Sequence, residues 1–118
     1  PLIDVKGLSA ALADFATERD WNQYHSPKNL VMALTGEVGE LCEIFQWLSE
    51  EASRSVATQP ETATAVREEL ADVTLYLVRL ASVLGVDLNE AVTHKLQKNA
   101  ANYPVEKAHG SHKKYNKL

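Results

Sequence analysis

Two stretches of the sequence determine the expected fold: residues 27–48, PKNLVMALTGEVGELCEIFQWL, and residues 60–84, PETATAVREELADVTLYLVRLASVL. In both, apolar residues recur at steps of three and four, which is the spacing of one face of an α-helix. The seams are Leu30, Leu34, Leu41, Ile44 and Leu48 in the first stretch, and Val66, Leu70, Val73, Leu77, Leu80 and Leu84 in the second. The sequence therefore predicts two long helices, each with an apolar seam for packing.

Weaker signals predict a helix on either side of this pair. Apolar residues at helical spacing predict one over residues 4–19, and a capping pattern predicts another over residues 87–102. Serine and aspartate cap helix starts because their side chains accept from free backbone N–H groups, and glycine commonly follows a helix end. The residues at such positions are Ser26, Gly85 and Asp87.

The whole pattern predicts an all-α protein, a bundle of four to five helices. We expect one domain over residues 1–104 and a basic tail over residues 105–118, with a polar loop at residues 49–59. Residues 73–84 are apolar on nearly every side, and a helix of that kind is buried on every side. Four helices of one short chain cannot cover it easily, so we expect a homo-oligomer with a shared helical core.

Composition excludes several classes of protein. The 118 residues are 45% hydrophobic and 24% charged, which is ordinary for a globular domain, and no apolar run is long enough to span a membrane. The single cysteine, Cys42, favours a reducing compartment, and we expect a cytoplasmic protein. Residues 35–72 hold nine acidic and two basic side chains, a net charge of −7. Such a centre repels a phosphate backbone, so we expect no nucleic-acid partner.

Four of these acidic residues form two pairs with the same spacing. Glu37 and Glu40 are three residues apart in one long helix, and Glu69 and Asp72 are three apart in the other. Each pair lies on one helix face, and antiparallel packing would bring all four together. Unpaired carboxylates in a half-buried site repel one another, whereas a hard divalent cation stabilises them. A set of carboxylates without histidine or cysteine favours Mg²⁺, with Mn²⁺ as a substitute.

The alternative is that these acids only face solvent, as pairs of this spacing often do. Glu37 argues against it, because this residue lies within the apolar seam. Gly36 and Gly39 flank it in mid-helix, where each glycine costs about 1 kcal/mol relative to alanine. We therefore expect a packed helix or a ligand to approach the backbone here. Cys42 is expected to be a small core residue.

These residues resemble a known family. The motif G-E-V-G-E-L at residues 36–41, followed by E-L-A-D-V at residues 69–73, matches the signature of the MazG-like all-α nucleoside triphosphate pyrophosphohydrolases. Further segments resemble its dCTP pyrophosphatase branch: R-D-W-N-Q-Y-H-S-P-K-N-L over 19–30, F-Q-W over 45–47, Y-L-V over 76–78, N-x-x-x-Y-P over 99–104 and K-Y over 114–115. The resemblance runs from about residue 8 to the end of the chain.

The resemblance implies a chemistry for the four carboxylates. It implies that Glu37, Glu40, Glu69 and Asp72 hold Mg²⁺ on a triphosphate, and that water cleaves the α–β linkage to give a nucleoside monophosphate and pyrophosphate. The same family implies a tetramer built from dimers. Glu37 or Glu40 would be the catalytic residue that orients the water, and the sequence leaves that choice open.

The resemblance also implies binding residues for the rest of a nucleotide. It places Trp21, Trp47 and Tyr76 at the base, with Trp21 contributed by a neighbouring subunit. Side chains expected at the phosphates, some of them in a tail that can close over the ligand, are Lys95, Lys98, Asn99, Lys113, Lys114 and Tyr115. His25 is expected only to fix the start of a helix.

The chain departs from the animal dCTP-specific relatives at positions near the base and the tail. Leu12 replaces a histidine, and Ala100 and Ala101 replace arginines.

The leading hypothesis is an Mg²⁺-dependent dNTP pyrophosphohydrolase, for which dCTP or a modified dCTP is the first substrate to test. The alternatives are a non-catalytic oligomeric module that binds metal or nucleotide, and a related enzyme such as a dUTPase-like or phosphoribosyl-ATP hydrolase.

Overall fold

The computed structural model describes residues 3–113, which form helices and contain no strand, confirming the all-α expectation. The elements are α1 (Val5–Glu18), the 3₁₀ turn η1 (Asn22–Tyr24), α2 (Pro27–Phe45), α3 (Glu50–Ser53), α4 (Ala63–Leu84), α5 (Leu88–Asn102) and α6 (Val105–Ala108). They fall into two compact units, residues 3–86 with α1 to α4 and residues 87–113 with α5 and α6. No described helix combines the length and the apolar character needed to cross a lipid bilayer.

The helix ends are fixed by the residues that the sequence singled out. The Ser26 side chain accepts a hydrogen bond from the backbone N–H of Asn29, and Asp87 accepts one from the N–H of Glu90. Gly85 ends α4 with a φ of 70°, a left-handed conformation that glycine adopts without steric cost. The predicted start of α2, end of α4 and start of α5 are therefore confirmed.

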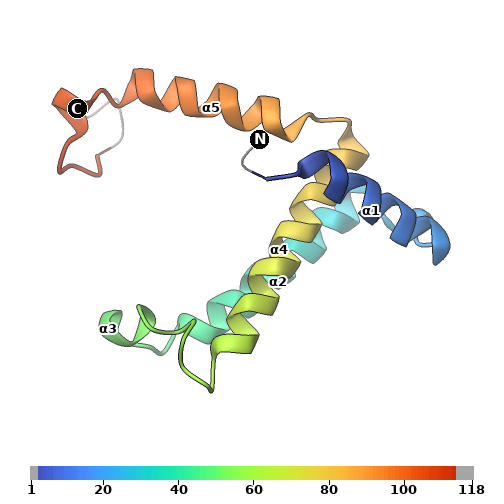
Figure 1. Ribbon diagram of the computed structural model, residues 1–118, viewed down its shortest axis with the longest axis horizontal. Coiled ribbons are helices and arrows are strands. Elements are labelled where there is room, and N and C mark those ends of the chain that lie inside the picture. The colour runs from blue at the N-terminus through green and yellow to red at the C-terminus, as the bar shows by residue number, and fades with distance from the viewer. Residues whose placement is uncertain (1–2, 114–118) are drawn as a thin grey trace. The chain divides into compact units, whose positions relative to one another are not determined.

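Helices α2 and α4 lie side by side (Figure 1). They run antiparallel, because Arg79 near the end of α4 contacts His25 just before α2, whereas Glu69 earlier in α4 lies beside Glu37 in the middle of α2. Helix α1 packs against α4. The buried apolar residues are Ala16, Leu30, Val56, Val66, Val78 and Ala81. The antiparallel pairing brings Glu69 of α4 beside Glu37 and Glu40 of α2.

Two predicted helices were three residues too long, the first at its end and the second at its start. Helix α2 ends at Phe45 rather than Leu48, because Ser49 adopts an extended backbone and caps the short helix α3, which the sequence did not predict. Helix α4 begins at Ala63 rather than Pro60. The Thr62 hydroxyl donates to the Val56 carbonyl at 2.6 Å and holds the preceding residues in a turn. The short helix α6, within the expected tail, was also not predicted.

Much of the apolar seam of α4 is not covered within residues 3–113. Val66 is buried, but Leu70 is 53% exposed and Leu77 is 43% exposed. Leu84, the last member of the seam, is exposed as well. The described part of one chain therefore does not cover α4 on every side. The expectation that a second copy covers this face stays a prediction.

Candidate active site

Three carboxylates meet where α2 and α4 pack together. Glu37 and Glu40 come from successive turns of α2, and Glu69 comes from α4. One oxygen from each of the three lies within 4.8 Å of the others. Glu37 and Glu69 are half-buried, and Glu40 is exposed. Oxygens this close can share one cation as ligands.

The electrostatics of this acidic cluster, defined as Glu37, Glu40 and Glu69, favour a cation. One carboxylate oxygen of Glu37 and one of Glu69 (Oε2 in each) are buried without a hydrogen-bond partner in the described chain. The pKa of Glu69 is raised to about 7. The largest cause is hydrogen bonding to the Glu37 carboxyl, followed by burial and then by hydrogen bonding to, and repulsion from, Glu40. Buried acceptors without donors are rare in proteins, and a hard divalent cation would satisfy them. The donor set therefore fits Mg²⁺ or Mn²⁺.

Two neighbouring features bear on this cluster. Asp72, the fourth acid of the motif, lies outside the group of three and lines a pocket one turn further along α4. A Cβ placed on Gly36 or Gly39 would meet nothing within 4 Å. Nothing in the described chain fills the space beside these glycines, and the approach of a helix from another subunit or of a ligand stays a prediction. Cys42 is exposed rather than a core residue.

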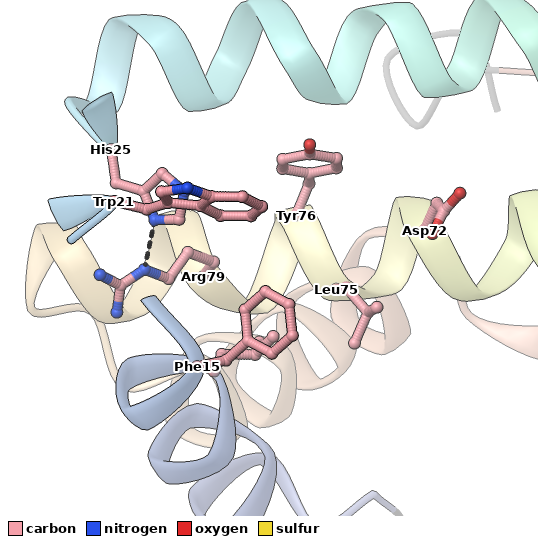
Figure 2. A pocket seen from close by; sticks show the side chains of 8 residues that line it. Phe15, Trp21, His25, Asp72, Leu75, Tyr76 and Arg79 are labelled. Atoms are coloured by element: carbon pink, nitrogen blue, oxygen red, sulfur yellow. Dashed lines mark hydrogen bonds between the residues drawn. The ribbon is translucent and has the colours of Figure 1, made fainter. Parts of the chain in front are cut away.

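The pocket beside Asp72 has a volume of about 160 Å³ and a mostly apolar and aromatic wall. Its wall combines α1, η1 and its flanks, and one face of α4. The lining residues are Leu12, Phe15, Trp21, His25, Asp72, Leu75, Tyr76 and Arg79. Figure 2 shows the rings of Trp21, Tyr76 and Phe15 gathered around it, with His25 and Arg79 at one end and Asp72 at the other.

Contacts between rings hold the aromatic wall in place. Phe15 and Trp21 meet edge to face, with ring centroids 5.6 Å apart and an interplanar angle of 68°. Trp21 also meets the edge of His25, at 6.3 Å between centroids. On the Phe15 ring, the guanidinium of Arg19 lies 3.6 Å from the centroid. Edge-to-face and cation–π contacts of this kind orient aromatic rings. The orientation of the Trp21 ring is therefore set by contacts within its own chain.

The end of the pocket away from Asp72 is polar. Arg79 is only 9% exposed. Its Nε–H donates to Nδ1 of His25 at 3.1 Å, and its Nη2 donates to Oδ1 of Asn22 at 2.8 Å. Burial, and then the positive charge of Arg79, lower the pKa of His25 below its usual 6.5. His25 is therefore neutral at physiological pH.

The structure brings together only some of the residues predicted to bind a nucleotide. Trp21 and Tyr76 line the pocket, whereas Trp47 is 88% exposed and outside it. Three phosphate candidates share one face of α5, in the other compact unit, namely Lys95, Lys98 and Asn99. Lys113 follows α6 outside any helix, and Lys114 and Tyr115 lie outside the described residues.

Sequence reasoning missed the polar end of the pocket. His25 was expected only to support the start of α2, and Arg79 was passed over as a polar interruption in an apolar helix. One signal was available, because Asp72, Leu75, Tyr76 and Arg79 are spaced by three, four and seven residues and must share a face of α4.

Comparison with known proteins shows the family of this chain. The model of the MazG-like family matches residues 33–118. The chain is 51% identical to dCTP pyrophosphatase 1 of Rattus norvegicus and 47% identical to that of Homo sapiens. Each alignment covers 99% of this chain and 67% of the relative. A crystal structure of a pyrophosphatase from Archaeoglobus fulgidus superposes with a TM-score of 0.77 at 40% identity, covering 84% of this chain and 91% of that one.

Proposed function

The chain belongs to the MazG-like family, and on that premise we propose that it is a pyrophosphohydrolase that converts deoxynucleoside triphosphates to monophosphate and pyrophosphate with Mg²⁺. The observation that carries the proposal is the position of the acidic cluster directly beside the aromatic pocket. Asp72 and Tyr76 follow Glu69 along α4 by three and seven residues. At about 1.5 Å of rise per residue, Tyr76 lies about 10 Å beyond Glu69 along the helix axis. That separation suits a nucleotide whose phosphates meet the cluster and whose base enters the pocket.

The acidic cluster supplies the electrostatic part of the reaction. Carboxylates drawn from Glu37, Glu40 and Glu69 would hold the cation, with Asp72 as a further ligand from the pocket side. When bound, the cation neutralises charge on the phosphate oxygens and lowers the pKa of a coordinated water. Hydrolysis then depends mainly on positioning. The carboxylate that is left off the cation, Glu37 or Glu40, accepts a hydrogen bond from the water and orients it toward the α–β linkage.

The pocket supplies the binding of the base. Trp21 and Tyr76 present aromatic faces, and stacking on one such ring is worth about 1–3 kcal/mol. A cavity of about 150 Å³ holds a benzene ring, so the volume of about 160 Å³ suits a single six-membered ring. A pyrimidine therefore fits better than a purine. This agrees with the name of the relatives, and we propose dCTP or a modified dCTP as the preferred substrate.

Further parts of the assignment complete the proposal. The exposed apolar seam of α4 supports assembly as a homo-oligomer, a dimer of dimers, in which Trp47 would complete a base site. Lys95, Lys98 and Asn99 would bind phosphates, together with the tail residues Lys113, Lys114 and Tyr115. The single cysteine supports a cytoplasmic location.

The experiment compares two variants of α2. We expect pyrophosphate release from dCTP by the full chain with Mg²⁺, loss of it with EDTA, and a fall of about 100-fold or more in Glu40→Gln. Glu43→Gln is the matched control, because Glu43 is exposed on the same helix, one turn beyond Glu40, and is absent from the acidic cluster. Equal activity in Glu40→Gln and Glu43→Gln would overturn the proposal. Binding of dCTP without turnover would support a non-catalytic module instead.

A further inference from the structure

A buried cation without a carboxylate partner lies at the polar end of the pocket. None of the ion pairs within residues 3–113 involves Arg79. Its charge is held by two neutral acceptors, Nδ1 of His25 and Oδ1 of Asn22. The amide nitrogen of Asn22 donates in turn to the Thr17 hydroxyl at 3.1 Å, which fixes the orientation of that amide. Arg79 is thus held by Asn22 of η1 and by His25 just after it, and Thr17 of α1 orients Asn22.

This arrangement determines where the proton of His25 resides. A guanidinium has only donors and does not lose its proton. Nδ1 of His25, which accepts from Arg79, must therefore be unprotonated, and the ring proton must sit on Nε2. The direction of the His25 pKa agrees with a neutral ring. Nε2 makes no hydrogen bond within the described chain and is not one of the buried polar atoms that lack a partner. Its N–H can therefore donate to a ligand.

The side chains of three residues at the polar end of the pocket consequently offer donors and no acceptor. They are the Nε2–H of His25, the guanidinium of Arg79 and the indole N–H of Trp21. Figure 2 shows the indole nitrogen of Trp21 at the same end as His25. Of the other residues that line the pocket, Leu12, Phe15 and Leu75 are apolar, whereas Tyr76 carries a hydroxyl that can donate or accept. A base that enters the pocket to this depth must offer acceptors.

We propose that His25 reads the edge of the base through Nε2–H, and that Arg79 is the positioning residue that fixes this tautomer. Cytosine offers two adjacent acceptors, O2 and N3, to such donors. Uracil and thymine keep the O2 acceptor but carry a proton on N3, so a donor placed at N3 would face another donor and remain unpaired, which binding sites reject strongly. The inference rests on the proposed function and adds to it a reason for discrimination among pyrimidines.

The first test needs no variant and no turnover. Long-range ¹H–¹⁵N correlation spectra of the full chain at neutral pH distinguish the two tautomers of a histidine ring. We expect His25 to carry its proton on Nε2, and Arg79→Gln to lose this single-tautomer signature. A proton on Nδ1 in the unaltered protein would overturn the proposal.

The second test measures base discrimination with the hydrolysable substrates dCTP, dUTP and dTTP under Mg²⁺. His25→Phe keeps a ring and removes the donor, so kcat/KM for dCTP should fall about 10- to 100-fold, mostly through KM, and the preference over dTTP should fall by the same factor. His94→Phe, a change of the same kind on α5, is the control and should keep the preference. An equal fall for all three substrates would show a merely structural role and overturn the proposal.

A third measurement separates this inference from the enzymatic one. The α,β-methylene analogue of dCTP cannot be cleaved at that linkage, and its affinity with Mg²⁺ can be measured by calorimetry. If the unaltered chain binds the dCTP analogue more tightly than the dTTP analogue and His25→Phe loses this preference, but neither parent nucleotide is hydrolysed, the proposed activity fails and base reading by His25 stands. If it hydrolyses dCTP but His25→Phe binds both analogues with the same preference as before, the activity stands and base reading fails.

Discussion

Protons and Mg²⁺ should compete for the acidic cluster, with Glu69 as the group that changes its protonation. Its pKa of about 7 lies well above the ordinary 4.5, chiefly because of hydrogen bonding to the Glu37 carboxyl. A ligand must be deprotonated to bind a metal. At pH 6 about a tenth of the molecules have Glu69 ionised, and at pH 8 about nine tenths do, so the affinity for Mg²⁺ should be about tenfold weaker at pH 6.

The sign of the accompanying stability change follows from the same pKa. Because the folded value is raised, the metal-free protein gains stability from this proton below about pH 4.5 and loses that gain as the pH rises through 7. Mg²⁺ should therefore raise the melting temperature more at pH 8 than at pH 6. Glu69→Gln mimics the protonated carboxyl, so it should stabilise the metal-free protein at pH 8 and bind Mg²⁺ weakly at every pH.

The assay is calorimetric titration of Mg²⁺ at pH 6, 7 and 8, each in two buffers of different ionisation enthalpy. The buffer dependence gives the number of protons released, which should be close to one at pH 6 and near zero at pH 8. Glu43→Gln is the control and should behave as the unaltered chain. Mg²⁺ affinity that does not change between pH 6 and pH 8, or binding without proton release at pH 6, would refute this reasoning.

Three further predictions concern the pocket, the core and the oligomer. Tyr76→Ala should raise KM for dCTP about 5- to 100-fold in steady-state kinetics and change kcat little, because a stacking face is lost. An unchanged KM would show that Tyr76 is not part of the base site. Leu30→Ala should lower the free energy of unfolding by about 2–5 kcal/mol in urea titrations, because Leu30 is only 2% exposed. A loss below about 1 kcal/mol would mean that the core around Leu30 is loosely packed. Leu77→Lys should shift sedimentation toward smaller species, since it charges the exposed seam of α4; unchanged sedimentation would place the interface elsewhere.

The fold could be predicted largely because its signals are local. The capping residues Ser26, Gly85 and Asp87 act within one turn of the backbone, so their types alone locate helix ends. The apolar seams identify long helices for the same reason. The short helices α3 and α6 were missed because four residues carry no periodicity, and their helical state depends on the turns around them.

The candidate site was predictable in part, for a reason of geometry. The spacing of Glu37 and Glu40 places both on one helix face, and antiparallel packing then adds Glu69, so this cluster follows from two local patterns. The pocket draws Phe15, His25 and Arg79 from segments up to 64 residues apart, and no local spacing connects them. Cys42 was misjudged because Leu41 and Ile44 nearby belong to the apolar seam, although Cys42 itself is exposed in the described chain.

The most direct test of the central claim is the identity of the products. ³¹P spectroscopy of dCTP incubated with the full chain and Mg²⁺ follows each phosphorus atom separately. The acidic cluster beside the aromatic pocket predicts dCMP and pyrophosphate in equal amounts, and no reaction once EDTA removes the cation. Release of orthophosphate with dCDP, or the same products at the same rate in EDTA, would contradict it.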